Sequence, residues 1–465
     1  MENISAFFKT VSDCLWGWPM IILLLGTHIF LTVRLRVPQR KLLTAIRLSV
    51  TRDPESRGKG DVSPFGALST ALAATIGTGN IIGVAAAVAL GGPGAVLWCW
   101  ITGIFGIATK YGEGVLAVKY RVRTPDGRMV GGPMYALERG LGWKWLAVLF
   151  AVFTAIASFG IGNTVQANAI ATIAHDSYHV SPYLVGTVLC VLTGTVILGG
   201  VRSIARVCSA LVPFMALFYI LGCVYILVVN APYLWPAVKI ICEAAFTPEA
   251  AGGGFVGTTV IMTARMGIAR GLFSNESGLG SEPIVAAAAQ TRNPVRQGLV
   301  SASGTFWDTV VICLMTGLVI VSSIIAHPDI TYADGAALTK TAFSKIPYVG
   351  TPLLNFGLLT FTFSTMIGWS YYGERAMEYL GGVKWIKYYR LVYILAVFLG
   401  SIISLTVVWN VADCMNAMMA IPNLVALLLL SGVIARETKK YLWSGRLDQH
   451  DDASSASTDN ETSIS

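Results

Sequence analysis

Long apolar stretches separated by short polar segments recur along the whole chain. Each stretch is close to the roughly 20 residues that an α-helix needs to cross the hydrocarbon core of a bilayer. We therefore predict an all-α polytopic membrane protein. About eleven transmembrane helices can be placed, at residues 15–33, 64–90, 94–118, 145–174, 182–199, 208–229, 255–290, 299–326, 351–378, 390–409 and 411–434.

Two of these stretches are interrupted near their middle. Gly77, Gly79 and Asn80 interrupt the second stretch, and a polar run from Phe273 to Ser281 interrupts the seventh. Glycine is a poor helix former, and hydrocarbon offers no partner to the backbone groups that a broken helix leaves free. Such breaks indicate a site where half-helix ends face an anionic group and a cation. A kink or close glycine packing is the alternative for a single break.

The two breaks suggest an internal repeat. Each break opens a group of five predicted helices, and the groups enter the membrane from opposite sides, as in inverted-topology repeats. The predicted organisation has five parts: an extra N-terminal transmembrane helix with a basic cytoplasmic loop (1–62), a first five-helix repeat (63–230), an extracytoplasmic loop (231–254), a second five-helix repeat (255–440) and a disordered cytoplasmic tail (441–465).

Composition agrees with a membrane protein, since 54% of residues are hydrophobic and 12% are charged. A soluble domain carries about 25% charged residues. The formal net charge is +8, and Lys and Arg gather in alternate loops such as 34–59 and 119–144. Basic loops stay cytoplasmic. We therefore predict a bacterial inner or cell membrane protein with its N-terminus outside and its C-terminus in the cytoplasm, and no nucleic-acid partner.

Other function classes lack their motifs in this sequence. It contains no G-x-x-x-x-G-K-[ST], H-E-x-x-H or G-x-S-x-G motif, which disfavours ATP-driven and hydrolytic enzymes. A channel would show rings of pore-lining charge or a repeated carbonyl filter, and neither is present. A secondary transporter, rather than an enzyme, is the favoured class.

Several motifs resemble one known family, the alanine or glycine:cation symporters. The motifs are GTGN (77–80), GGPGA (91–95), KYGE (110–113), GPMY (132–135), GLFSNESGLGS (271–281) and STMIGWSYYGE (364–374). The resemblance covers about residues 15–440. It implies sodium-coupled uptake of small neutral amino acids on a leucine-transporter-like fold. Proton coupling, or a preference for glutamine or serine, is the alternative.

The expected substrate site uses both breaks. The resemblance assigns carboxylate binding to the backbone N–H groups of Thr78 and Gly79, and Gly79 would supply torsional freedom and close approach. Phe273, Ser274 and Asn275 at the second break would offer carbonyls to the substrate ammonium. The amides of Gln166 and Asn163 would polarise the site. Met366 and Trp369, one helical turn apart, would wall the side-chain pocket. Plain packing is the alternative for the last pair.

Sodium is the co-transported ion that the resemblance implies, bound by oxygen atoms as hard cations prefer. In the similar leucine-transporter motif, residues matching Thr75 (carbonyl) and Asn80 (side chain) bind one sodium ion. A second ion is held by residues matching Ala73 and Ile76 (carbonyls) and Ser364 and Thr365 (hydroxyls). The alternative for these hydroxyls is a bond within their own helix.

Charged residues inside predicted helices are further candidates, because intramembrane charges commonly mark function. Asp308 would tune a cation site or accept a proton. Lys110 and Glu113, three positions apart, would form a local ion pair. A gate of opposite charges is a further hypothesis, for Arg265 and Arg270 with Glu276 or Glu282.

Overall fold

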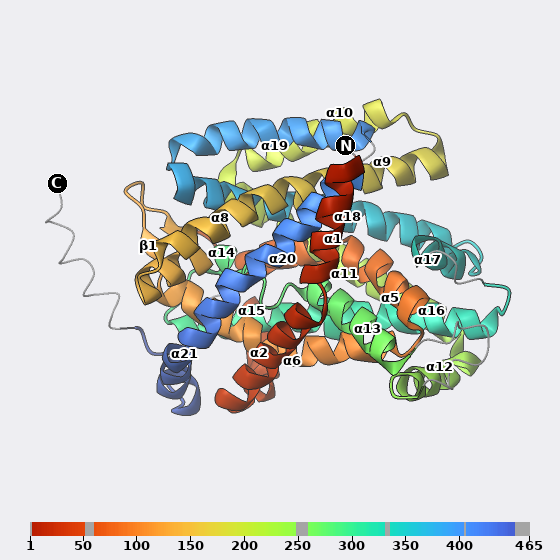
Figure 1. Ribbon diagram of the computed structural model, residues 1–465, viewed down its shortest axis with the longest axis horizontal. Coiled ribbons are helices and arrows are strands. Elements are labelled where there is room, and N and C mark those ends of the chain that lie inside the picture. Colours follow the sequence, from red (N-terminus) through yellow and green to blue (C-terminus); the bar gives the residue numbers. More distant parts are fainter. Residues whose placement is uncertain (1, 52–59, 248–258, 331–334, 404–405, 452–465) are drawn as a thin grey trace, which may run out of the picture.

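The computed structural model describes residues 2–51, 60–247, 259–330, 335–403 and 406–451, and these are almost entirely helical (Figure 1). The helices are α1 (Glu2–Leu15), α2 (Trp18–Arg34), α3 (Leu42–Val50), α4 (Pro64–Thr75), α5 (Val84–Gly91), α6 (Ala95–Lys119), α7 (Pro133–Tyr135), α8 (Lys144–Phe159), α9 (Val165–Tyr178), α10 (Pro182–Ile197), α11 (Gly200–Val229), α12 (Ala231–Ala244), α13 (Val260–Asn275), α14 (Pro283–Ala286), α15 (Pro294–Thr305), α16 (Leu314–Ala326), α17 (Gly335–Ser344), α18 (Gly350–Gly381), α19 (Lys384–Ile402), α20 (Thr406–Leu429) and α21 (Ser431–Thr438). A two-stranded antiparallel hairpin, β1 (Val122–Arg123) and β2 (Met129–Val130), comes after α6.

The predicted all-helical fold is confirmed, whereas the number of spans and the inverted repeat stay predictions. Within the described residues, five helices are long and apolar enough to cross a membrane, or up to seven if each bent pair counts as one span. Two of the five contain π-helical segments, Gly160–Thr164 between α8 and α9 and Phe306–Cys313 between α15 and α16. The tail from 452 onward lies outside the described residues.

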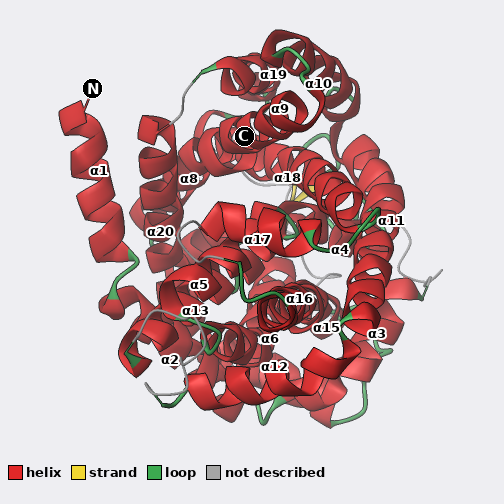
Figure 2. Ribbon diagram, turned by 90° about the vertical axis from the view of Figure 1, so that its right-hand side faces the viewer, coloured by secondary structure: helices red, strands yellow, loops and turns green. Residues whose placement is uncertain are grey.

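Helix α2 lies where the sequence predicted a span at 15–33, and a further helix, α1, precedes it. The amphipathic α1 ends at Leu15, and α2 begins at Trp18 with Pro19 in its first turn. Proline suits the first turn of a helix because its missing N–H would have no partner there. Figure 2 shows α1 at the edge of the molecule, where it packs beside α20.

The first break has the predicted form. Ser63 caps α4 by accepting a hydrogen bond from the Gly66 N–H (3.0 Å), and Pro64 occupies the first helical position. The helix ends at Thr75, and Ile76 is extended. A π-helical turn, Gly79–Gly83, leads into α5, whose axis is bent by 53° from that of α4.

The second break differs from the prediction on its C-terminal side. Helix α13 ends at Asn275, and the chain then turns through left-handed Glu276 (φ 53°), Gly278 (φ 90°) and Gly280 (φ 85°). The expected half-helix to residue 290 is only the four-residue α14. Beyond α14, Arg121 donates hydrogen bonds to the carbonyls of Ala287 (3.2 Å) and Ala289 (2.8 Å), which replace helical partners.

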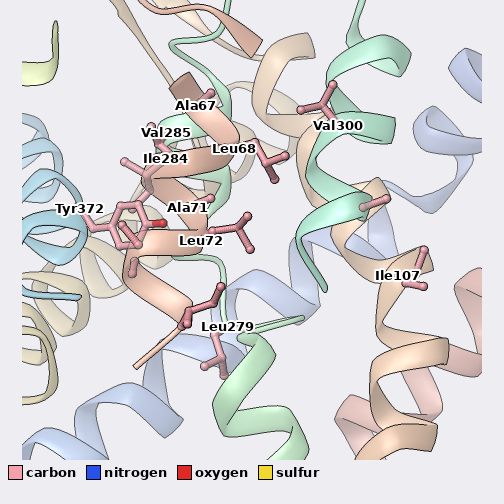
Figure 3. Close-up of a cluster of buried hydrophobic side chains, with 14 of the residues drawn as sticks. Ala67, Leu68, Ala71, Leu72, Ile107, Leu279, Ile284, Val285, Val300 and Tyr372 are labelled. Atoms are coloured by element: carbon pink, nitrogen blue, oxygen red, sulfur yellow. The ribbon is translucent and has the colours of Figure 1, made fainter. Parts of the chain in front are cut away.

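Both breaks lie in the apolar core. Side chains of α4 meet those of α14, α15 and α18 in one buried cluster, and Leu279 joins it from the second break (Figure 3). Helices α9, α10 and α19 pack together along one side of the molecule (Figures 1 and 2). Because both breaks are buried among apolar side chains, each backbone group freed there needs a hydrogen-bond partner.

Candidate functional site

The first break is closed by the side chain of Asn80, which is buried. Its Oδ1 accepts a hydrogen bond from the Gly77 N–H (2.8 Å). Its Nδ2 donates to Oδ1 of Asp308 (2.6 Å). Asn80 therefore holds the unwound backbone of the break against the π-helical segment between α15 and α16.

Asp308 connects the two breaks. Its carboxylate is 1% exposed and accepts hydrogen bonds from Ser274 at the end of α13 (3.1 Å) and from the Thr309 hydroxyl (2.6 Å), besides Asn80. Three donors around one buried carboxylate compensate much of its desolvation. This carboxylate could supply oxygen ligands to a cation beside Asn80, one of the predicted cation ligands.

A second group of oxygens forms where α18 crosses the end of α4. The Ser364 hydroxyl lies 3.2 Å from the carbonyl oxygen of Ala73, and the Thr365 hydroxyl lies 3.4 Å from that of Ile76. The structure thus brings the four oxygens of this predicted cation site together. Each hydroxyl also lies within reach of the Phe361 carbonyl, at 2.8 and 2.9 Å, so the bond within the helix is formed too.

The close crossing of these helices depends on a glycine. A Cβ added to Gly368 would lie 2.7 Å from the backbone nitrogen of Ala74 and 2.8 Å from its Cβ. Any larger residue would push α18 away from α4. Gly368 therefore allows the hydroxyls of Ser364 and Thr365 to reach the carbonyls of the first break.

A small cavity lies between the two breaks, α9, α18 and α20. Eight of the predicted site residues line it: Thr75, Thr78, Gly79, Gln166, Phe273, Ser274, Thr365 and Trp369. Ile161, Glu276 and Asn416 line it as well. Residues predicted from opposite halves of the chain therefore share one cavity.

Two polar atoms of the cavity wall are buried and have no hydrogen-bond partner among the described residues: Gln166 Oε1 and Asn416 Oδ1. The other end of the Gln166 amide is fixed, because its Nε2 donates to the Ile161 carbonyl (3.0 Å). Two acceptors are thus available to a polar ligand, since a buried polar atom is normally paired. Asn416 was missed at the sequence level, because a single polar residue in an apolar stretch carries no motif.

Three predicted residues lie elsewhere. Met366 packs with Ala167 and Ile170 in a separate apolar cluster, as expected if it serves packing and not the substrate pocket. The Asn275 Oδ1 accepts a bond from the Ser277 N–H (2.9 Å), so this side chain shapes the turn. Asn163 donates to the carbonyl of Tyr393 (2.8 Å). None of the three is in the cavity lining.

Gly79 lines the cavity, and its backbone does not use the torsional freedom that was predicted for it. The described glycines with positive φ include neither Gly77 nor Gly79, because the π-helical turn keeps right-handed geometry. A Cβ on Gly79 would point across the cavity, 3.6 Å from both Phe273 Cδ1 and Ser274 Cα. Close approach is therefore the physical reason for glycine at this position.

The predicted ion pair between Lys110 and Glu113 is wrong. The Lys110 ammonium donates instead to the Glu276 carbonyl (3.4 Å). Glu113 Oε1 accepts from the N–H groups of Gly278 and Gly280 (3.1 Å each) and from the Asn423 amide (2.6 Å). Both charged side chains form hydrogen bonds with the unwound backbone of the second break. The spacing of residues along the sequence could not reveal these tertiary contacts.

The predicted arginine gate is not formed within the described part of the chain, where neither arginine pairs with a glutamate of the second break. Glu282 instead accepts a hydrogen bond from Ser301 (2.7 Å), and Glu276 accepts one from Ser281. The two glutamates are thus held by hydroxyls of their own surroundings.

The model of the sodium:alanine symporter family matches residues 1–455. Sodium/alanine symporter AgcS of Methanococcus maripaludis is 50% identical over 447 residues, which are 95% of this chain and 98% of that protein. The probable sodium/glutamine symporter GlnT of Bacillus subtilis is 37% identical over 436 residues, 92% of this chain and 89% of its own.

Among solved structures, that of MhsT in complex with L-phenylalanine is similar, with a TM-score of 0.52 at 14% identity over 83% of this chain and 95% of that one. A mutant of the Eremococcus coleocola manganese transporter gives a TM-score of 0.50 at 15% identity over 80% of this chain and 78% of that one. At such identities the likeness shows the fold alone.

Removing one partner of the Asn80–Asp308 bond should destabilise the protein more than removing both. Asn80→Leu leaves a buried carboxylate and the Gly77 N–H short of partners, each at a cost of about 1–3 kcal/mol. Replacing both partners by apolar side chains removes part of that cost. We expect the thermal unfolding midpoint of the purified protein to fall in Asn80→Leu and to recover partly in Asn80→Leu/Asp308→Leu. Additive losses in the double variant would contradict a direct coupling.

Proposed function

The chain belongs to the sodium:alanine symporter family, and from this premise we propose how it binds its substrates. It is a multi-pass membrane transporter, not an enzyme, and it performs sodium-coupled symport of alanine or glycine. The observation that carries the proposal for the site is the cavity between the two breaks, with the unpartnered amide oxygens of Gln166 and Asn416. We assign the amino acid to this cavity.

The proposed substrate pose follows from the signs of the partial charges on the surrounding polar groups. Thr78 and Gly79 precede and open the π-helical turn, and the first N–H groups of a helix lack intrahelical partners and favour an anion. The substrate carboxylate binds there. The ammonium lies toward the amide oxygens of Gln166 and Asn416. A small side chain then faces Phe273 and Trp369.

Two sodium positions fit the oxygen donors of the site, with sodium as cargo rather than a resident cofactor. One uses the carbonyls of Ala73 and Ile76 with the hydroxyls of Ser364 and Thr365. The other uses the Thr75 carbonyl and Asn80 Oδ1, and we add the Asp308 carboxylate as its charged ligand. Hard cations favour such oxygens, and an anionic ligand offsets the cost of bringing sodium into the core.

Coupling follows from the shared backbone. Residues 73–80 carry proposed ligands of both sodium ions and of the amino acid, so each ligand stabilises the same arrangement of the first break. Each then raises the affinity of the others, and within any pair of ligands the effect is reciprocal. For orientation, we propose an outside N-terminus and a cytoplasmic C-terminus in the plasma membrane, because Lys and Arg gather in alternate loops.

Uptake into proteoliposomes tests the function. An inward sodium gradient should drive alanine above its equilibrium level, and an equal potassium gradient should not. Accumulation driven by a proton gradient without sodium would contradict sodium coupling. Glycine should compete with labelled alanine, and stronger competition by glutamine or serine would revise the substrate preference.

Thr365→Val should weaken sodium binding, since valine keeps the shape and loses the hydroxyl oxygen. Loss of one such contact corresponds to about a tenfold higher sodium concentration for half-maximal uptake. Thr362→Val is the matched control, because the Thr362 hydroxyl bonds carbonyls of its own helix. Equal sodium dependence in the two variants, at equal abundance, would remove Thr365 from the site.

Gly79→Val should abolish alanine binding while the protein still folds. Its Cβ meets nothing closer than 3.6 Å, so the protein tolerates it, but the side chain fills space that the substrate needs. The measurements are equilibrium binding of labelled alanine and the thermal midpoint with and without sodium. We expect no alanine binding and a retained stabilisation by sodium. Alanine binding at the affinity of the unmodified protein would show that Gly79 does not contact the substrate.

A further inference from the structure

Trp16, in the turn between α1 and α2, contacts a residue of the substrate cavity. Its indole packs edge-on against the ring of Phe273, with centroids 6.2 Å apart and planes at 65°. Phe273 lines the cavity. Aromatic pairs favour this edge-to-face geometry, and it restricts the rotation of both rings. The N-terminal segment, which lies outside the predicted five-helix repeats, therefore touches the site directly.

The same turn is tied to a second helix of the cavity wall. The indole N–H of Trp16 donates to the Asp413 carbonyl (3.3 Å), and the Ser12 hydroxyl donates to Asp413 Oδ2 (2.7 Å). Asp413 lies on α20, one helical turn before Asn416, whose unpartnered amide oxygen faces the cavity. Two hydrogen bonds thus fix the position of the indole relative to Asn416.

Helix α2 continues along the second break. A Cβ on Gly278 would lie 2.7 Å from Leu24 Cδ2, so the Leu24 side chain rests on the turn itself. One turn further, His28 is buried and hydrogen-bonded to the Thr109 hydroxyl of α6 (2.7 Å). The N-terminal segment therefore braces the second break on both sides of Asn275, at Phe273 and at Gly278.

We propose that Trp16 is a positioning residue that holds the Phe273 ring over the cavity and thereby sets the largest substrate side chain that the transporter accepts. The inference rests on the proposed function of the cavity. With Trp16 in place, the Phe273 ring cannot turn outward, and the space beside a bound amino acid stays small. Without the indole, the ring can move into the vacated volume, and longer apolar side chains fit.

The test compares Trp16→Ala and Trp16→Phe with Trp18→Ala. Trp18 lies two residues away, at the start of α2, and is 40% exposed, so it controls for the loss of a tryptophan next to the same turn. The measurement is the inhibition of labelled alanine uptake by methionine and by leucine, relative to glycine. In Trp16→Ala we expect inhibition by the longer amino acids to strengthen about two- to tenfold, the range of one aromatic pair. Trp16→Phe keeps a ring and should stay close to the unmodified protein.

Abundance in the membrane and the thermal midpoint show whether each variant folds. A structural role alone would lower uptake of all amino acids equally and leave the inhibition ratio unchanged, and that outcome would overturn the inference. The Phe273→Ala background adds a second criterion. If Trp16 acts through Phe273, then Trp16→Ala should change the ratio no further in that background, and an additive change would also overturn it.

The inference and the proposed function fail in different ways. Sodium-driven alanine uptake by the unmodified protein, with the same inhibition ratio in Trp16→Ala, rejects only the role of Trp16. An unmodified protein that takes up no amino acid in response to sodium rejects the proposed function itself.

Discussion

Two broken helices buried in an apolar core impose the constraint on which the rest of this structure depends. Every N–H and C=O group that a break releases must find a partner inside the protein. Asn80 and the hydroxyls of α18 serve the first break. Glu113 and Arg121 serve the second, by accepting from two N–H groups and donating to two carbonyls. The burial of these charged side chains, which would otherwise be costly, thus has a structural reason, because they form hydrogen bonds with the backbone groups that the break leaves free.

These partners come from distant parts of the sequence, so meeting the constraint also assembles the bundle. Asp308 joins Asn80 to Ser274, and Asn423 of α20 meets both Glu113 and the Gly278 carbonyl (2.9 Å). A polar group in such a contact can exchange its protein partner for a bound ligand, whereas apolar packing offers no such exchange. The hydroxyl-to-carbonyl distances of 3.2 and 3.4 Å are at the long end for hydrogen bonds, where a cation can take over the same oxygens.

The sequence was sufficient for the features that local chemistry determines and insufficient for those that tertiary contacts determine. Glycine and polar residues inside apolar stretches located both breaks, and eight predicted residues share one cavity. Asn416 was missed because an isolated amide has no recognisable spacing. Lys110 and Glu113 were paired incorrectly because the backbone of the second break outcompetes a local ion pair. The short α14 also escaped prediction, since Arg121 from another element satisfies the carbonyls beyond it.

The arrangement also gives a physical reason for placing cations and substrate on one unwound segment. An intact helix has already committed its carbonyls and N–H groups to internal bonds, whereas an unwound segment can offer both kinds of group at adjacent residues. The carbonyls of Ala73 and Ile76 and the N–H groups of Thr78 and Gly79 lie within seven residues. Under the proposed assignment, the opposite charges bound there would attract one another in a medium of low dielectric constant. Sodium would then favour the carboxylate of the amino acid, and a break that is costly for folding would couple the two.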